Sequence, residues 1–170
     1  MSEITFQGKP IHTCGDFPSV GKTAPDFLLT NSRLIDVSLA DFSGKKKLLN
    51  IVPSLDTPTC AISARKFNEK ASRLKDVVML MVSADLPFAQ DRFCGKEKLK
   101  DIIPLSTFRS TFSDDYGVRI IDSILAGLSA RAVVIIDEEN KVIYSQLIQE
   151  IAEEPDYESA LEALSKANIT

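Results

Sequence analysis

Only a few side chains in this sequence are suited to catalysis, and they are mainly thiols. The chain has three cysteines, Cys14, Cys60 and Cys94, and one histidine, His12. An odd and sparse set of cysteines does not predict a disulfide framework. Because Cys-x-x-Cys and His-x-x-x-His pairs are also missing, we expect no metal site and no cofactor. We expect His12 and Cys14 to be solvated or packed, so the question is whether the other cysteines do thiol chemistry.

Cys60 follows a stretch with the residues expected at a helix start. In Thr57-Pro58-Thr59-Cys60, Thr57 suits the N-cap and Pro58 suits the first helical position. Cys60 would then lie in the first turn, near free backbone N–H groups and the positive end of the helix dipole. Both favour the thiolate, which is the nucleophilic form of cysteine.

The same helix allows a plainer interpretation of Cys60. An apolar stripe repeats at helical spacing along it, formed by Cys60, Ala64, Phe67, Ala71 and Leu74. A cysteine on such a stripe can be an inert core residue. The spacing alone leaves both interpretations open.

Two residues far from Cys60 in the sequence favour its interpretation as a nucleophile. Arg131 directly precedes the apolar run 132–136, so it stands at the start of a buried strand and needs an anionic partner or exposure. A thiolate is one possible partner, and a carboxylate is the other. Cys94 lies in residues 84–100, which we interpret as a loop with a short, weak helix at 88–93. A movable partner thiol would be placed on such a segment.

The elements that would position these residues form an α/β pattern. Compact apolar runs at 48–52, 77–82 and 132–136 predict strands buried on both faces of a sheet. The helix that begins near Cys60 joins the first two, which gives a right-handed parallel βαβ unit. Residues 142–148 follow the third run after a short polar turn, so the sheet is mixed.

Further elements complete a thioredoxin-like fold. We predict an N-terminal hairpin, strands at 27–30, 35–39 and 104–108, and one helical turn at 111–116. A last helix is capped by Asp156 and has an apolar face of Tyr157, Ala160, Leu161, Leu164 and Ala167. We expect one domain over residues 1–170, in which a mixed central sheet is flanked by helices and residues 1–20 form a hairpin extension.

Composition is that of an ordinary globular chain. Hydrophobic residues make up 44% and charged residues 26% of 170 residues, and the net charge is −4. This charge argues against nucleic acid or an anionic membrane as a partner. The short basic run 45–47 is expected to be a solvated turn. No apolar segment has the length of a signal core or a membrane span, so we expect a cytoplasmic protein.

Pro53, Thr57 and Cys60 together resemble the Pro-x-x-x-Thr-x-x-Cys motif of the peroxiredoxins. Ala24-Pro25-Asp26-Phe27 is similar to the approach segment of that family. Residues 83–95, 125–132 and 153–157 resemble the bacterial thiol peroxidase subfamily, and the resemblance covers nearly the whole chain.

The resemblance implies an atypical two-cysteine peroxidase that acts in antioxidant defence. Cys60 would be the peroxidatic cysteine, and Cys94 would resolve its sulfenic acid as an intrachain disulfide that thioredoxin reduces. Thr57 would hydrogen-bond the peroxide or thiolate, Arg131 would stabilise charge, and Pro53 would shield the pocket from water.

The resemblance also implies a homodimer and hydroperoxide substrates, with organic hydroperoxides favoured over hydrogen peroxide. Leu55, Phe88 and Leu125 are candidates for lining an apolar substrate pocket. A disulfide needs Cα atoms within about 7 Å. We therefore expect the local turns at Cys60 and Cys94 to unwind when they join.

Two other functions compete with this interpretation. In a redox-sensing or protein-binding module, Cys60 would oxidise once as a signal. A thiol–disulfide oxidoreductase is disfavoured, because the helix start lacks Cys-x-x-Cys.

Overall fold

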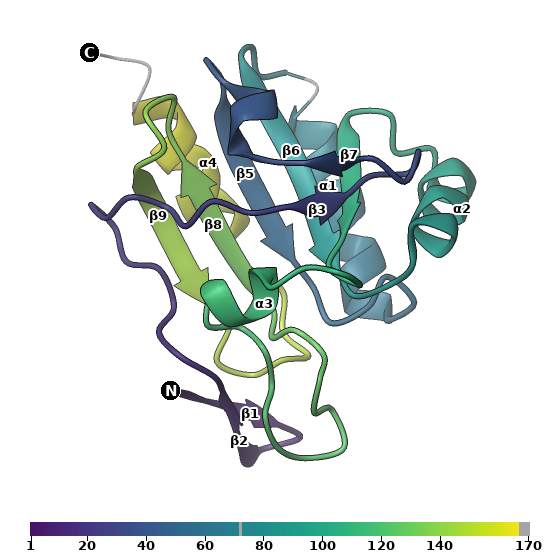
Figure 1. Ribbon diagram of the computed structural model, residues 1–170, viewed down its shortest axis with the longest axis vertical. Helices are drawn as coiled ribbons and strands as arrows, with labels where there is room; N and C mark the ends of the chain where they lie inside the picture. The colour runs from purple at the N-terminus through teal and green to yellow at the C-terminus, as the bar shows by residue number, and fades with distance from the viewer. Residues whose placement is uncertain (72, 167–170) are drawn as a thin grey trace.

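A mixed β-sheet forms the centre of the computed structural model, which describes residues 1–71 and 73–166 (Figure 1). Seven strands of this described part belong to it: β3 (Leu29–Thr30), β4 (Asp36–Val37), β5 (Lys46–Ile51), β6 (Val77–Ser83), β7 (Ile102–Ser106), β8 (Ala132–Ile136) and β9 (Val142–Leu147). Their order across the sheet is β4-β3-β7-β6-β5-β8-β9. β6 pairs in parallel with β5 and β7, whereas β8 is antiparallel to β5 and β9. The predicted mixed α/β sheet is confirmed.

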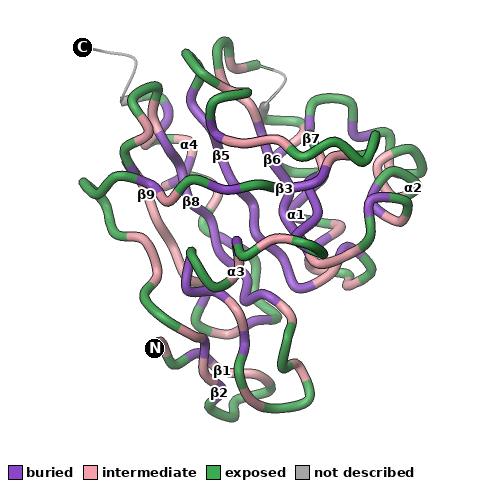
Figure 2. The backbone as a smooth tube through the Cα atoms, viewed as in Figure 1, coloured by how far each residue is buried: buried purple, intermediate pink, exposed green. Residues whose placement is uncertain are grey.

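Helices cover both faces of the sheet because the buried strands alternate their side chains between two apolar clusters. Leu48 of β5 packs in the cluster that includes α1 (Pro58–Ala71) and α4 (Tyr157–Lys166). Leu49 packs in the opposite cluster, together with residues of the 3₁₀ helix η1 (Leu39–Phe42) and of α3 (Phe112–Asp115). Figure 2 shows the buried central strands between exposed loops. Ala167, expected on the last helix face, lies outside the described residues.

The predicted N-terminal hairpin is present as β1 (Ser2–Phe6) and β2 (Lys9–Thr13). Its turn, Gln7-Gly8, has φ angles of 53° and 78°, a conformation that glycine adopts without strain. The hairpin is held to the segment after β9, since the Thr5 N–H donates to the Gln149 carbonyl at 2.7 Å. It therefore lies at the end of the sheet where β8 begins and β9 ends (Figure 1).

The expectation of a solvated turn at 45–47 is wrong for two of the three lysines. Lys46 and Lys47 belong to β5 and are 1% and 0% exposed. The Lys47 Nζ donates to the Asp137 carbonyl at 3.2 Å and to Asn140 Oδ1 at 3.0 Å. Burial lowers the pKa of Lys47. Long aliphatic stems let both residues extend a buried strand while their amines reach oxygen acceptors.

The helix expected at 88–93 is longer than predicted. α2 (Pro87–Glu97) has 11 residues, so Cys94 lies within the helix and not at its end. Pro87 occupies the first turn, where proline favours a helix, and the side chains of Pro87 and Gln90 are buried. Tertiary packing therefore stabilises a helix whose local sequence is weak.

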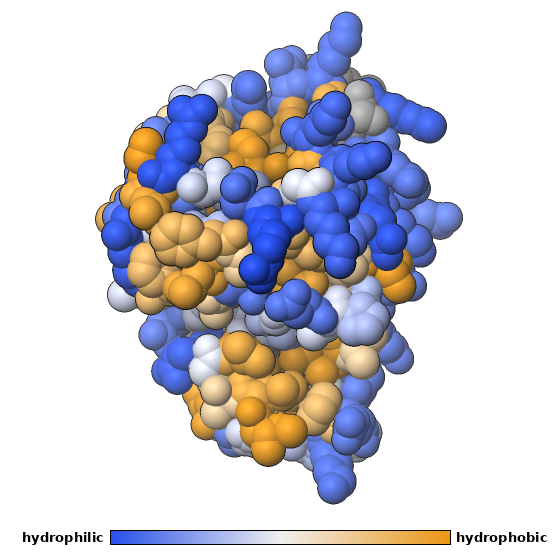
Figure 3. Space-filling view, turned by 90° about the vertical axis from the view of Figure 1, so that its right-hand side faces the viewer, coloured by the Kyte–Doolittle hydropathy of each residue, from blue (hydrophilic) through white to orange (hydrophobic). Residues whose placement is uncertain are grey.

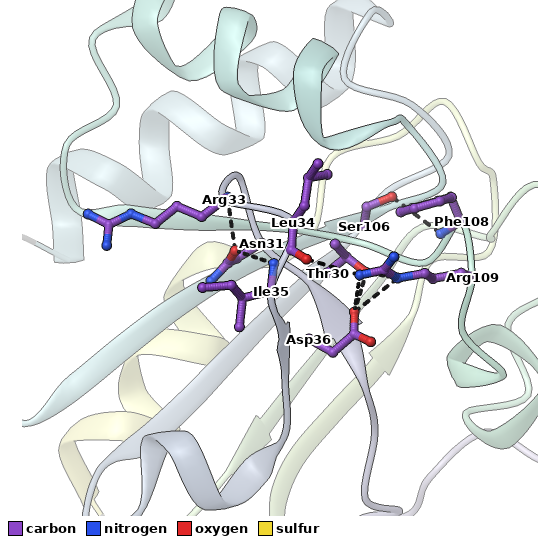
Figure 4. Close-up of polar contacts among 9 residues, drawn as sticks. All are labelled: Thr30, Asn31, Arg33, Leu34, Ile35, Asp36, Ser106, Phe108 and Arg109. Carbon is purple, nitrogen blue, oxygen red and sulfur yellow. Dashed lines mark hydrogen bonds and ion pairs between the residues drawn. The ribbon is translucent and has the colours of Figure 1, made fainter.

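The outer edge of the sheet is shorter than predicted, because β3 and β4 contain two residues each. Arg109, which follows β7, fixes this edge (Figure 4). Its Nη2 donates to Asp36 Oδ1 at 2.9 Å and to the Leu34 carbonyl at 3.0 Å, and its Nε donates to Thr30 Oγ1 at 3.2 Å. This side-chain anchoring replaces part of the strand pairing that the sequence predicted.

Candidate active site

Cys60 lies in the first turn of α1 and is 0% exposed. The Thr57 hydroxyl lies 2.6 Å from its Sγ, and the Arg131 Nη1 donates to the same sulfur at 3.1 Å. Cys60 also belongs to the apolar cluster that contains Ala64 and Phe67. The residue is thus packed in a core, as the plainer interpretation expects, and its sulfur also lies within reach of two polar donors.

Arg131 is 2% exposed and directly precedes β8, as predicted. Its Nε donates to the Ile151 carbonyl at 2.8 Å, which directs Nη1 to Cys60. Of its two expected partners, the sulfur is within hydrogen-bond distance. The carboxylate of Glu154 interacts with Arg131 only weakly. The pKa of Glu154 is lowered mainly by hydrogen bonds from Lys66 and Tyr157, and the charge of Arg131 lowers it by a smaller amount.

The Thr57 hydroxyl has two possible acceptors, one of which is the Cys60 sulfur. Its hydroxyl lies 3.1 Å from the Ser54 carbonyl and 2.6 Å from Cys60 Sγ. A hydroxyl has one proton and can donate to only one acceptor at a time. It can therefore donate to a thiolate, and it can turn to the carbonyl when the sulfur carries its own proton.

The sulfur's two donors border a cavity of about 210 Å³. Pro53, Thr57 and Arg131 line it, together with Phe6, Ser54, Pro58, Thr59, Leu125, Leu128, Ile151 and Ala152. Most of these side chains are apolar. Of the three residues expected to line a substrate pocket, Leu125 borders this cavity, whereas Leu55 and Phe88 do not. Leu55 lines a neighbouring cavity that Thr57 also borders, and Phe88 is 69% exposed on α2.

Cys94 is half-buried in α2 and packs against the same apolar cluster as Cys60. All three cysteines are free. Burial, with a smaller contribution from Asp91, raises the pKa of Cys94 from 9.0 to about 11. In this conformation Cys94 is therefore a protonated and weakly nucleophilic thiol.

A larger cavity of about 480 Å³ separates the start of α1 from α2. Leu55, Thr57 and Ala61 line one side, and Ala89 and Phe93 of α2 line the other. The two cysteine-bearing segments thus face each other across open space.

His12 and Cys14 make their contacts elsewhere. The His12 Nδ1 lies 2.7 Å from Asp122 Oδ2, and this contact raises the pKa of His12. The Cys14 Sγ lies 3.5 Å from Asp114 Oδ1. Neither residue borders the cavity beside Cys60.

Sequence reasoning missed Phe6, the Ile151 carbonyl and Asp85. Asp85 accepts hydrogen bonds from the Ser54 hydroxyl and the Leu55 N–H, both at 2.8 Å, and so fixes the loop before α1. The sequence held one signal for Asp85. The loop 53–57 follows β5 and Asp85 follows β6, and the carboxyl ends of these parallel strands lie side by side at one end of the sheet. Nothing comparable in the sequence indicated Phe6 or the Ile151 carbonyl.

The chain is similar in sequence and in fold to several known proteins. The Redoxin family profile matches residues 19–161. A thiol peroxidase from Mycobacterium bovis is 51% identical over 164 residues, which are 96% of this chain and 99% of that protein. A peroxiredoxin-like crystal structure from Aquifex aeolicus is 36% identical, with a TM-score of 0.92 and 96% coverage of both chains. A thiol peroxidase structure from Chromobacterium violaceum shares the fold at 24% identity, with a TM-score of 0.90, 98% coverage of this chain and 97% of that one.

Proposed function

The chain belongs to the Redoxin family, in the thiol peroxidase branch of the peroxiredoxins, and we propose that Cys60 is where it reduces peroxides. One observation carries this proposal: a hydroxyl and a buried guanidinium converge on the Cys60 sulfur beside an apolar cavity. Two donors aimed at one atom stabilise negative charge on it before the substrate arrives.

In the first step, the Cys60 thiolate attacks the terminal oxygen of the hydroperoxide. The O–O bond breaks, a new S–O bond forms, and the departing oxygen takes a proton and leaves as an alcohol or water. Sulfur is oxidised to the sulfenic acid while the peroxide is reduced. Arg131 and Thr57 stabilise the charge that grows on the departing oxygen, and Pro53 shields the pocket from water.

The proposed substrates are hydrogen peroxide and organic hydroperoxides. Phe6, Leu125, Leu128 and Ile151 support the second group, because they give the cavity apolar walls on which an alkyl substituent can pack.

In the second step, the Cys94 thiol attacks the sulfenic sulfur and water leaves, which forms an intrachain disulfide. Thioredoxin then reduces this disulfide by thiol–disulfide exchange and is itself oxidised. The free thiols, the raised pKa of Cys94 and the cavity between α1 and α2 support a rearrangement of both segments in this step.

We place the enzyme in the cytoplasm, as a homodimer in antioxidant defence. Within the described residues, no helix is long and apolar enough to cross a membrane. Ile121 and Ile124 are 42% and 88% exposed and support a self-association surface. Figure 3 shows apolar side chains gathered at the lower end of the molecule, where the hairpin and the loop 121–127 lie.

Replacing each cysteine separates the roles. With thioredoxin, thioredoxin reductase and a hydroperoxide, Cys60→Ser is expected to abolish peroxide consumption. Cys94→Ser should consume about one equivalent and stop at the sulfenic acid, whereas Cys14→Ser should turn over normally. A redox sensor would instead show one turnover in the unmodified protein. Full activity of Cys60→Ser would refute the assignment.

A further inference from the structure

We propose that Asp85 is a positioning residue that ties the loop before Cys60 to the helix that carries Cys94. The inference rests on the proposed function, because it concerns the balance between peroxide reduction and disulfide formation. Asp85 follows β6 and lies between the two cysteine-bearing segments in the chain. Its side chain contacts the loop before Cys60 directly and is linked to α2 through the Ser83 hydroxyl.

On the loop side, the Asp85 carboxylate accepts two hydrogen bonds. The Ser54 hydroxyl donates to Oδ1 and the Leu55 N–H donates to Oδ2, both at 2.8 Å. The Ser54 hydroxyl in turn accepts the Asp56 N–H at 3.2 Å. Three consecutive residues of the loop are thus held by one carboxylate, directly or through one hydroxyl.

On the helix side, the connection runs through Ser83, which is 0% exposed. Its hydroxyl donates to Asp85 Oδ2 at 2.8 Å and accepts from Gln90 Nε2 of α2 at 2.9 Å. The Gln90 Nε2 also donates to the Leu105 carbonyl at 3.0 Å, which fixes α2 to β7. Ser106 of β7 donates to the Asp85 carbonyl at 2.6 Å.

The loop end of this network reaches the sulfur. The Thr57 hydroxyl lies within hydrogen-bond distance of both the Ser54 carbonyl and Cys60 Sγ. A continuous set of contacts therefore runs from Gln90 through Asp85 to Cys60. The bonds at the Gln90 end are buried and those at the loop end are partly buried, and members of such a connected network depend on one another for their positions.

The network favours one of the two conformations that catalysis needs. The loop must stay in place for Thr57 to meet the peroxide, but it must move for Cys60 to reach Cys94. Asp85 therefore speeds sulfenic acid formation and slows its attack by Cys94.

Rapid-quench kinetics can measure the two opposed effects, on sulfenic acid formation and on disulfide formation. The reduced enzyme is mixed with hydrogen peroxide and quenched with a thiol-alkylating reagent. Intact mass spectrometry then counts thiol, sulfenic acid, disulfide and sulfinic acid. In Ser54→Ala and Asp85→Asn, we expect sulfenic acid formation about tenfold slower and disulfide formation about tenfold faster, the effect of one hydrogen bond to a charged group. Less sulfinic acid should accumulate at high peroxide.

Asp137→Asn is the matched control. The Asp137 carboxylate accepts two backbone N–H groups in the turn after β8, from Glu139 and Lys141, and lies outside the network. Both rates should be unchanged in this variant. Rates that fall together in the Asp85 and Ser54 variants would indicate a purely structural role and overturn the proposal, as would rates that do not change.

Coupling across the network gives an independent test. Gln90→Leu releases the helix side at similar volume, so it should also speed disulfide formation. Combined with Ser54→Ala, it should accelerate the step no more than the larger single effect, whereas a full product of the two would refute coupling. These two variants decide the question if Asp85→Asn fails to fold. If Cys60 forms no sulfenic acid even in Cys94→Ser, the proposed function itself fails.

Discussion

At the scale of the residue, Cys60 has two environments. One side of the residue packs in an apolar cluster with Ala64 and Phe67, which fixes its rotamer and excludes water. The sulfur itself meets the hydroxyl of Thr57 and the guanidinium of Arg131. These two side chains are thus the polar partners of a sulfur that is otherwise packed among apolar groups. In the proposed function, the reactivity of the Cys60 thiol therefore depends on these two donors.

Replacement of Thr57 by valine tests this dependence. Thr57→Val keeps the shape but removes the hydroxyl, so we expect sulfenic acid formation to slow about 10- to 100-fold, the range for one hydrogen bond to a charged group. Thr57→Ser keeps the hydroxyl and should stay within about threefold of the unmodified rate. Rapid-quench mass spectrometry with limiting peroxide measures both. Equal rates in the valine and serine variants would show that the hydroxyl does not contribute.

Residue-level chemistry was partly predictable from the sequence. A cysteine in the first turn of a helix and an arginine before a buried strand carry local signals, and the structure brings Cys60 and Arg131 together. Asp85 carries no comparable local signal. Its role depends on where the ends of two parallel strands meet, and a side chain's partners across a sheet cannot be read from its own neighbours in the chain.

At the scale of the element, α2 shows where local sequence misleads. Gly95 lies near the helix end and Pro87 at its start, so the segment looked like a loop with a weak helix. Burial of Pro87 and Gln90 against the sheet overrides that weakness. The start of β5 was predicted to be a solvated turn because of its lysines. Charge patterning takes no account of long side chains that bury their aliphatic stems, as Lys46 and Lys47 do.

The position of Cys94 in α2 predicts a pH dependence. Burial raises the pKa of its thiol from 9.0 to about 11, so the folded helix favours the protonated form. The contribution of the protonated Cys94 thiol to the stability of folded α2 is complete below pH 9.0, and it is lost as the pH rises through about 11. Opening of α2 should therefore become easier across this interval.

Nuclear magnetic resonance of ¹³Cβ-labelled cysteine measures this directly. In a variant with Cys14 and Cys60 replaced by serine, the Cys94 signal should remain that of a thiol at about pH 10, where an ordinary cysteine is ionised. In guanidinium chloride, the same signal should titrate near the ordinary value. A midpoint near 9.0 in the folded protein would mean that α2 already exposes the thiol.

At the scale of the whole molecule, segments far apart in the chain build the cavity beside Cys60. Phe6 comes from the N-terminal hairpin, Leu125 and Leu128 from the loop before β8, and Ile151 from the segment after β9. Ile4 and Ile11 of the hairpin pack against Ile151 and Ile120, so the hairpin is a wall of the site. The sequence predicted the hairpin but gave no sign of this use, because the contact joins opposite ends of the chain.

This arrangement predicts that the hairpin sets substrate preference. Phe6→Ala removes an aromatic wall, and a bulky aromatic hydroperoxide should lose about 1–2 kcal/mol of apolar contact. Its KM should rise about tenfold, since about 1.4 kcal/mol is a factor of ten. Hydrogen peroxide has no apolar part to contact Phe6, so its kcat/KM should change less than about twofold. Steady-state assays with thioredoxin measure both substrates.

Ile35→Ala is the control, because Ile35 is a large apolar residue that is 55% exposed at the outer edge of the sheet, outside the cavity and outside the loop 121–127. It should leave the ratio of kcat/KM for the two substrates unchanged. A parallel loss for both peroxides in Phe6→Ala would mean that the ring supports Thr57 or Arg131 instead of the substrate. A lowered Tm with an unchanged ratio would assign Phe6 to hairpin packing alone. Only a selective loss for the bulky substrate makes the hairpin part of the binding site.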